Sequence, residues 1–271
     1  MDASHVSPVA ARYPLDRPGD PDYRALVGRC REVLRDTGAL ALPGFLPPAL
    51  VREVRSHARA AMPGGYRMSG RYNPYSEDLS AGDDLSLPPD HPARLRLPAS
   101  HLSLAGDLLP ADSVLYRLHR DPSVCRFLAD ALESPALYPV TDPLGGVNVL
   151  VYEPGNANGW HFDSVSFVVS LMLQNASEGG CYEYIPWMRS DADENLAEVA
   201  RRMRSPDLPD GVHRITLDPG TLFLFKGRHT LHRVTRVAGD RNRIIAILSY
   251  HRTPGWQVSE GTRLALYGRV A

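Results

Sequence analysis

The chain has 271 residues, enough for one large domain with a full hydrophobic core. Its composition, 43% hydrophobic and 23% charged with a formal net charge of −1, is that of an ordinary globular protein and argues against nucleic acid or an anionic membrane as the main partner. Three scattered cysteines indicate no disulfide framework, and residues 1–14 have no apolar leader, so we expect a single cytoplasmic domain over residues 1–271.

The first 136 residues are predicted to be mainly helical. Asp20-Pro21 is a typical N-cap and first helical residue, and apolar residues then recur at helical spacing until Gly38. A second amphipathic helix is expected to begin at Pro47-Pro48 and to end before Gly64-Gly65. A third helical region, residues 112–133, is interrupted at Asp121-Pro122, where the aspartate can cap a new helix.

Residues 66–110 are polar, rich in proline, glycine and aspartate, and without a clear period, so we expect a loop or a lid there. From Leu137 onward the pattern changes to short runs rich in β-branched and aromatic residues, with one helical insertion at Asp191–Arg204. Many short strands at such spacing predict a sandwich or a jelly roll. The expected strands are Val147–Tyr152, Ser166–Leu173, Cys181–Ile185, His213–Leu217, Leu222–Phe225, His232–Val237 and Arg243–Tyr250.

One pattern in the strand-rich half is typical of a metal site. In an extended chain successive side chains alternate between faces, so His161 and Asp163 point the same way and can share one metal ion. His232, 69 residues after Asp163, can join them if a jelly roll brings its strand near. Two imidazoles and one carboxylate on one face of an octahedral metal are typical of mononuclear non-haem Fe(II) oxygenases. The sequence therefore predicts His161, Asp163 and His232 as iron ligands.

Such a triad leaves three metal positions open, enough for dioxygen and a 2-oxo acid bound through two atoms. The second carboxylate of that acid needs a cation. Arg243 begins the last strong strand, and its guanidinium can bind a carboxylate through two parallel hydrogen bonds. Arg241 has the same strand parity and is the alternative, and Lys226 is a weaker third candidate.

Several stretches around these residues resemble the Fe(II)/2-oxoglutarate-dependent oxygenases, and more narrowly the free amino-acid halogenases and hydroxylases of the BesD and HalD kind. The resemblance covers residues 137–271 well and the first 110 residues only in general character. The matching stretches are Tyr-Glu-Pro-Gly at 152–155, Gly-Trp-His-Phe-Asp at 159–163, Tyr-Glu-Tyr-Ile-Pro at 182–186, Pro-Gly-Thr-Leu at 219–222, Gly-Arg-His-Thr-Leu-His-Arg-Val-Thr at 227–235, Gly-Asp-Arg-Asn-Arg at 239–243 and Tyr-Gly-Arg at 267–269.

The resemblance implies an α+β fold with a double-stranded β-helix core, a cupin-like jelly roll, over residues 137–271. The helices of residues 1–136 would flank this core and include a possible lid. It also implies that Fe(II) is bound by the triad, that Arg243 pairs with the co-substrate 2-oxoglutarate, and that Tyr152 helps to hold the same carboxylate. The enzyme would use O2 to remove hydrogen from an unactivated C–H bond.

One position separates the outcomes within that family. Its halogenases have a small residue in place of the triad carboxylate, which leaves room for chloride, whereas this chain has Asp163. We therefore expect hydroxylation as the default reaction, with desaturation or radical cyclisation, for example cyclopropane formation, as alternatives that use the same residues. Halogenation is not expected.

The substrate implied by the resemblance is a small molecule, a free amino acid or a close derivative, in specialised metabolism. Polar residues near the expected mouth are candidates to bind it, namely Asn158, Ser164, Ser249 and His251. Their lack of charge argues against a basic side chain on the substrate and leaves neutral, nitro-bearing and amide-bearing side chains open. The aromatic residues Tyr182 and Tyr184 are expected in the core or at the rim.

Two other classes of protein are compatible with the same residues. His/His/Asp sets also bind Zn²⁺, so a zinc-dependent cupin-type hydrolase or isomerase is the main alternative, and it predicts activity without oxygen and no role for Arg243. A non-catalytic binding module that keeps the barrel is the other. The intact ligand set argues against that module.

Overall fold

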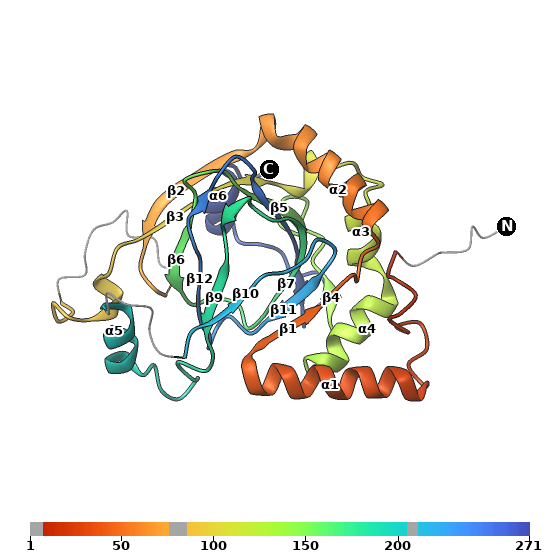
Figure 1. Ribbon diagram of the computed structural model, residues 1–271, viewed down its shortest axis with the longest axis horizontal. Coiled ribbons are helices and arrows are strands. Elements are labelled where there is room, and N and C mark those ends of the chain that lie inside the picture. The colour runs from red at the N-terminus through yellow and green to blue at the C-terminus, as the bar shows by residue number, and fades with distance from the viewer. Residues whose placement is uncertain (1–7, 76–85, 205–210) are drawn as a thin grey trace.

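The computed structural model describes residues 8–75, 86–204 and 211–271, and its centre is an eleven-stranded antiparallel sheet that curls on itself (Figure 1). The path of paired strands is β1-β11-β7-β14-β5-β3-β6-β12-β9-β10, and β2 pairs with β3 beside this path. The strands are β1 (Ala39–Leu42), β2 (Tyr66–Tyr72), β3 (Leu97–Leu104), β5 (Val147–Tyr152), β6 (Asn158–His161), β7 (Val168–Gln174), β9 (Tyr182–Ile185), β10 (His213–Ile215), β11 (Leu222–Phe225), β12 (Leu231–Val234) and β14 (Arg243–Leu248).

The pairing divides this sheet into two halves. One half contains β11, β7, β14 and β5, and the other contains β6, β12, β9 and β10. Strand β3 connects them, because it pairs with β5 along Leu102–Leu104 and with β6 through Ala99 and Asn158. Figure 1 shows the two halves facing each other, which is the double-stranded β-helix predicted from the sequence. Two short pairs complete the strands: β13 (Val237–Ala238) with β8 (Glu178–Gly179), and β15 (Tyr250–His251) with β4 (Tyr138–Pro139).

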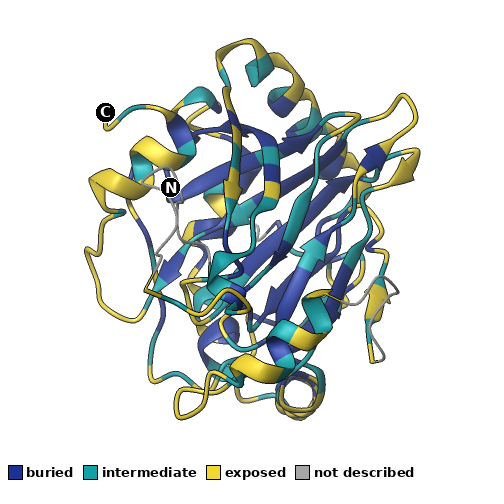
Figure 2. Ribbon diagram, turned by 90° about the vertical axis from the view of Figure 1, so that its left-hand side faces the viewer, coloured by how far each residue is buried: buried dark blue, intermediate teal, exposed yellow. Residues whose placement is uncertain are grey.

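Alternation along the strands gives the sheet two apolar faces. Val149 and Val151 point outward and pack with the helices, whereas Leu150 and Tyr152 point into the barrel beside residues such as Phe223. Figure 2 shows the strands largely dark blue, with exposed yellow on the helices and loops. The outer layer consists of α1 (Pro21–Thr37), α2 (Pro48–Ala61), α3 (Val114–Arg120) and α4 (Pro122–Ala131).

The N-terminal helices begin and end at the residues that the sequence indicates. The Asp20 carboxylate accepts a hydrogen bond from the amide of Asp22, and Gly38 ends α1 in the left-handed conformation at a φ of 68°. Asp121 caps α4 in the same way as Asp20 caps α1. The short helix α5 (Leu196–Arg204) begins five residues later than Asp191, where the sequence predicts its start.

The region predicted as a loop or lid differs from the expectation, because β2 and β3 lie within residues 66–110. Strand β2 exposes Arg67 and Arg71, and β3 buries the polar residues His101 and Ser103, so neither strand has a clean apolar alternation. Residues 76–85 lie outside the described part of the chain, and a lid there stays a prediction. The sequence analysis also missed β1 and the C-terminal helix α6 (Glu260–Tyr267).

The helices were also compared with the length and hydropathy of a membrane span. Within the described ranges, none is long and apolar enough to cross a bilayer.

Two glycines of the α1 region predict opposite effects of the same substitution. A methyl group at Gly38 would lie 2.7 Å from the Thr230 hydroxyl oxygen on left-handed backbone, whereas a methyl group at Gly28, inside α1, meets nothing within 4 Å. Gly38→Ala should lower the free energy of unfolding by about 1 kcal/mol or more, and Gly28→Ala should raise it by roughly 0.5–1 kcal/mol. Urea denaturation measures both, and equal effects would contradict the assigned helix end.

Candidate metal centre

Two neighbouring strands bring the three predicted ligands together. Strands β6 and β12 are antiparallel, and His161 lies directly opposite His232. Asp163 follows β6, and its amide donates to the carbonyl oxygen of Gly227 at 3.1 Å. The Asp163 Oδ1 atom lies 3.7 Å from His161 Nε2 and 3.4 Å from His232 Nε2. All three donor atoms lie within 4.8 Å of one another, so one metal ion can contact all three.

Backbone carbonyls fix which nitrogen of each histidine faces the centre. His161 Nδ1 lies 2.7 Å from the carbonyl oxygen of Gly159, and His232 Nδ1 lies 2.9 Å from that of Thr230. A proton on each Nδ1 satisfies these carbonyls and leaves the Nε2 lone pair free to bind a metal.

The surroundings also favour the protonation states that a divalent metal needs. Burial, together with the neighbouring His232, lowers the pKa of His161 to about 4, so this imidazole is neutral at pH 7. Burial alone would raise the pKa of Asp163, but His232 and His161 hold it below its ordinary value. Neutral imidazoles beside an ionised carboxylate form a donor set that fits Fe(II).

Gly227 gives the Asp163 carboxylate its position, and the sequence analysis missed this residue. A Cβ atom at Gly227 would lie 1.7 Å from Asp163 Oδ2 and 2.6 Å from its carboxyl carbon. The carboxylate therefore packs directly on the glycine backbone, and no larger residue fits. Gly227 begins the Gly-Arg-His-Thr-Leu-His stretch that carries His232, but nothing in the spacing indicates which glycine contacts the triad.

The predicted co-substrate residues Arg243 and Tyr152 lie side by side inside the barrel. They are register partners on β14 and β5, and the guanidinium carbon of Arg243 lies 5.3 Å from the centre of the Tyr152 ring. Arg243 is only 2% exposed, and its Nε atom has no hydrogen-bond partner among the residues that the structure describes. Burial lowers the pKa of Arg243. An unpaired buried cation is costly, so this arrangement fits a bound anion such as a carboxylate.

The alternative arginine lies in a different environment. Arg241 is exposed on the surface, and its guanidinium donates to the carbonyl oxygens of Asn175 at 2.9 Å and Ala176 at 3.3 Å. Lys226 lies over the Trp187 ring at 5.7 Å. Of the three candidates, the geometry favours Arg243.

Of the predicted substrate residues, the structure brings Asn158 to the centre. Its side-chain nitrogen lies 3.4 Å from His161 Nε2, and its side chain also hydrogen-bonds the Tyr152 hydroxyl. Ser164 follows Asp163, but it is exposed, and its carbonyl oxygen accepts a hydrogen bond from Arg228 at 3.4 Å.

The other two predicted substrate residues lie elsewhere. Ser249 and His251 follow the C-terminal end of β14, whereas Arg243 begins that strand. The Ser249 hydroxyl donates to the Gly145 carbonyl at 2.7 Å, and His251 stacks on Trp256 with ring centres 4.8 Å apart. Neither side chain is near the triad.

An aromatic side chain expected in the core or at the rim also contacts the centre. The Tyr182 ring stacks on His232, with ring centres 5.5 Å apart. Burial raises the pKa of Tyr182 well above its ordinary value, so its hydroxyl stays protonated beside the charged groups Asp163 and Arg243. Tyr182 and His232 belong to paired strands, β9 and β12, which explains the contact.

Replacing Gly227 by alanine should displace the Asp163 carboxylate and weaken divalent metal binding by about tenfold or more. Visible absorption during titration with Co(II) measures this affinity. In an Asp163→Ala background the same substitution should have no further effect, because the group it displaces is gone. An equal loss in both backgrounds would contradict the role assigned to Gly227.

Comparisons with known proteins follow the same residues. A family model described as halogenase D matches residues 110–263. No curated protein matches the chain in sequence. Among solved structures, the α-ketoglutarate-dependent epimerase SnoN from nogalamycin biosynthesis is 16% identical with a TM-score of 0.55, covering 84% of this chain and 83% of SnoN. The carbocyclase SnoK from the same biosynthesis is 13% identical with a TM-score of 0.54, covering 82% of each chain.

A third solved structure, HygX from Streptomyces hygroscopicus with nickel and 2-oxoglutarate bound, is 14% identical with a TM-score of 0.52, covering 83% of this chain and 87% of HygX. At these identities the three structures show a shared fold. The halogenase D model matches more than half of the chain. The chain therefore belongs to the halogenase D family of Fe(II)- and 2-oxoglutarate-dependent oxygenases.

Proposed function

We propose that this enzyme hydroxylates an unactivated C–H bond of a free amino acid or a close amino-acid derivative. In this proposal His161, Asp163 and His232 hold Fe(II), and Arg243 with Tyr152 holds the distal carboxylate of 2-oxoglutarate. The observation that carries the proposal is Arg243, a buried guanidinium without an anionic partner in the described chain, inside the barrel that holds a complete triad.

The charges of the site match the co-substrate. 2-Oxoglutarate has one carboxylate beside its keto group, which suits the metal, and a second carboxylate at its other end. Arg243 can receive that second carboxylate through two parallel hydrogen bonds, and the Tyr152 hydroxyl is near enough to assist. When bound, iron and 2-oxoglutarate supply with O2 the oxidising power that removes hydrogen from the substrate. The buried aromatic walls of Tyr182 and Tyr152 exclude water from this centre.

The Asp163 carboxylate supports oxygenation over halogenation. Within the family that the chain resembles, the halogenases carry a small residue at this position, and chloride takes the place of the carboxylate. Here the carboxylate packs on Gly227 and faces both histidines. Desaturation and radical ring closure use the same residues, and the titles of related folds name an epimerase and a carbocyclase. Product mass therefore has to be measured together with turnover.

The groups nearest the metal centre support a substrate with neutral polar recognition. Asn158 contacts both His161 and Tyr152, and its amide can donate to and accept from an amino-acid backbone. No aspartate or glutamate besides Asp163 belongs to the donor cluster among the described residues. This supports the expectation that the substrate side chain is neutral.

A zinc-dependent hydrolase or isomerase remains the alternative of another class. It would use the triad but not a buried cation on the far side of Tyr152. The lack of an anionic partner for Arg243 within the described chain therefore favours a co-substrate with a second carboxylate.

The proposed substrate class is tested by incubating the protein with Fe(II), 2-oxoglutarate, O2 and each member of an amino-acid panel. At least one amino acid with a neutral side chain should stimulate succinate formation. The product should gain one oxygen atom, whereas loss of two hydrogens would indicate desaturation or cyclisation. Amino-acid turnover without oxygen would overturn the proposal in favour of the zinc alternative.

Arg243→Ala should raise the 2-oxoglutarate concentration needed for half-maximal turnover by about tenfold or more, because the carboxylate loses a charge-assisted pair. Co(II) binding should be unchanged. Arg241→Ala is the matched control, since it removes an arginine two residues away that faces solvent. If Arg241→Ala raised the requirement and Arg243→Ala did not, the assignment would be reversed.

A further inference from the structure

His101 is a buried imidazole that the protein itself does not use. It lies on β3 and is 6% exposed, and neither of its ring nitrogens has a hydrogen-bond partner among the described residues. Its ring centre lies 5.5 Å from that of Tyr152. Burial lowers the pKa of His101 to about 4, so the ring is neutral at pH 7, with one donor and one acceptor nitrogen.

The strand register gives His101 its place relative to the proposed co-substrate site. Leu102 pairs with Val151, so His101 lies opposite Tyr152, which in turn pairs with Arg243. Leu102 points outward into the helix-covered core, so His101 points into the barrel. Tyr152 therefore lies between Arg243 and His101. The imidazole is on the side of Tyr152 that faces away from the proposed 2-oxoglutarate anchor.

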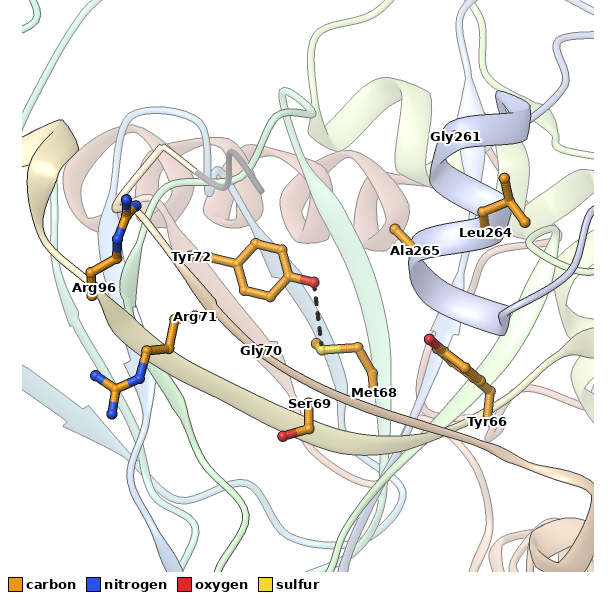
Figure 3. A pocket seen from close by; sticks show the side chains of 10 residues that line it. All are labelled: Tyr66, Met68, Ser69, Gly70, Arg71, Tyr72, Arg96, Gly261, Leu264 and Ala265. Atoms are coloured by element: carbon orange, nitrogen blue, oxygen red, sulfur yellow. Dashed lines mark hydrogen bonds between the residues drawn. The ribbon is translucent and has the colours of Figure 1, made fainter. Parts of the chain in front are cut away.

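On its other side, His101 adjoins the wall of a cavity. Its register partner on β2 is Met68, which lines a cavity of about 730 Å³ between β2 and α6 (Figure 3). Figure 3 shows Met68 accepting a hydrogen bond from the Tyr72 hydroxyl, with Leu264 and Ala265 of α6 across the cavity and Arg71 at one end. This volume is within the range that binds small organic molecules. His101 thus lies between Tyr152 and the residues that line the cavity.

We propose that His101 hydrogen-bonds a polar group of the primary substrate, an amino acid or its derivative that approaches over the cavity between β2 and α6. This inference rests on the proposed function and adds a specificity-determining residue to it. A neutral imidazole can donate to a carboxylate or carbonyl and accept from an amide, a hydroxyl or an amino group. The bond satisfies a nitrogen that is otherwise buried without a partner.

A second buried histidine shows what a structural role looks like in the same protein. His119 is 2% exposed, and burial likewise lowers its pKa to about 4. Its Nε2 atom lies 2.7 Å from the carbonyl oxygen of Ser249, so its ring joins α3 to the strand end near Ser249. His101 has the same burial without such a bond, and a polar group kept in that state lowers stability.

The two histidines therefore predict opposite stability effects of the same substitution. His101→Phe keeps the ring and removes two unpaired nitrogens, so the melting temperature should stay the same or rise. His119→Phe removes a used hydrogen bond, so the melting temperature should fall. Both are measured on the full chain with Co(II) and 2-oxoglutarate bound.

The substrate arm uses the amino acid that stimulates succinate formation most strongly. His101→Phe should raise its KM by about tenfold, the value of one buried hydrogen bond, with an unchanged half-saturating 2-oxoglutarate concentration. His101→Asn, which keeps a donor and an acceptor, should recover part of the affinity. His119→Phe, which is far from the proposed site, should leave the KM unchanged.

A binding arm does not depend on turnover. In the protein loaded with Zn²⁺ and 2-oxoglutarate, the ring-nitrogen NMR signals of His101 should shift when that amino acid is added and those of His119 should not. Stimulation in the wild type with an unchanged KM in His101→Phe, or with unshifted His101 signals, would overturn this inference and leave the proposed function standing. Stimulation by no amino acid, with no shift from any member of the panel, would overturn both.

Discussion

The antiparallel pairing of β6 with β12 is the constraint on which the rest of the site depends. It sets His161 opposite His232, although 71 residues separate them in the chain. The same two strands supply the carbonyls of Gly159 and Thr230 that orient the rings, and the turn before β12 supplies Gly227 for the carboxylate. A slip of one residue in this register would turn one histidine to the outer face, and the donor set would be lost.

The barrel interior carries polar groups that do not stabilise the folded chain by themselves. Arg243 and His101 flank Tyr152, and both are buried with ring or guanidinium nitrogens that no described residue satisfies. Each lowers stability in the absence of a ligand. Together they divide the interior into a cationic side, suited to a carboxylate of the co-substrate, and a neutral polar side next to the cavity. Stability given up inside this barrel is a sign of where ligands bind.

Much of this could be predicted from the sequence, because the relevant signals are local. The alternation of His161 and Asp163, the strand Leu222–Phe225 and the caps at Asp20 and Asp121 each depend on neighbours within a few residues. Strand β3 could not be predicted, because its buried face carries His101 and Ser103 and its pairing is non-local. Ser249 has the wrong place for a substrate residue because β14 runs straight, so six residues past Arg243 it lies roughly 20 Å away. Gly227 and Tyr182 act through contacts that only the folded register creates.

The central claim is that the triad holds Fe(II) together with 2-oxoglutarate. Its most direct measurement is the visible absorption of the protein mixed with both in the absence of oxygen. A weak charge-transfer band should appear only when both are present, and it should disappear in Asp163→Ala. Absence of the band in the wild-type protein would contradict the account.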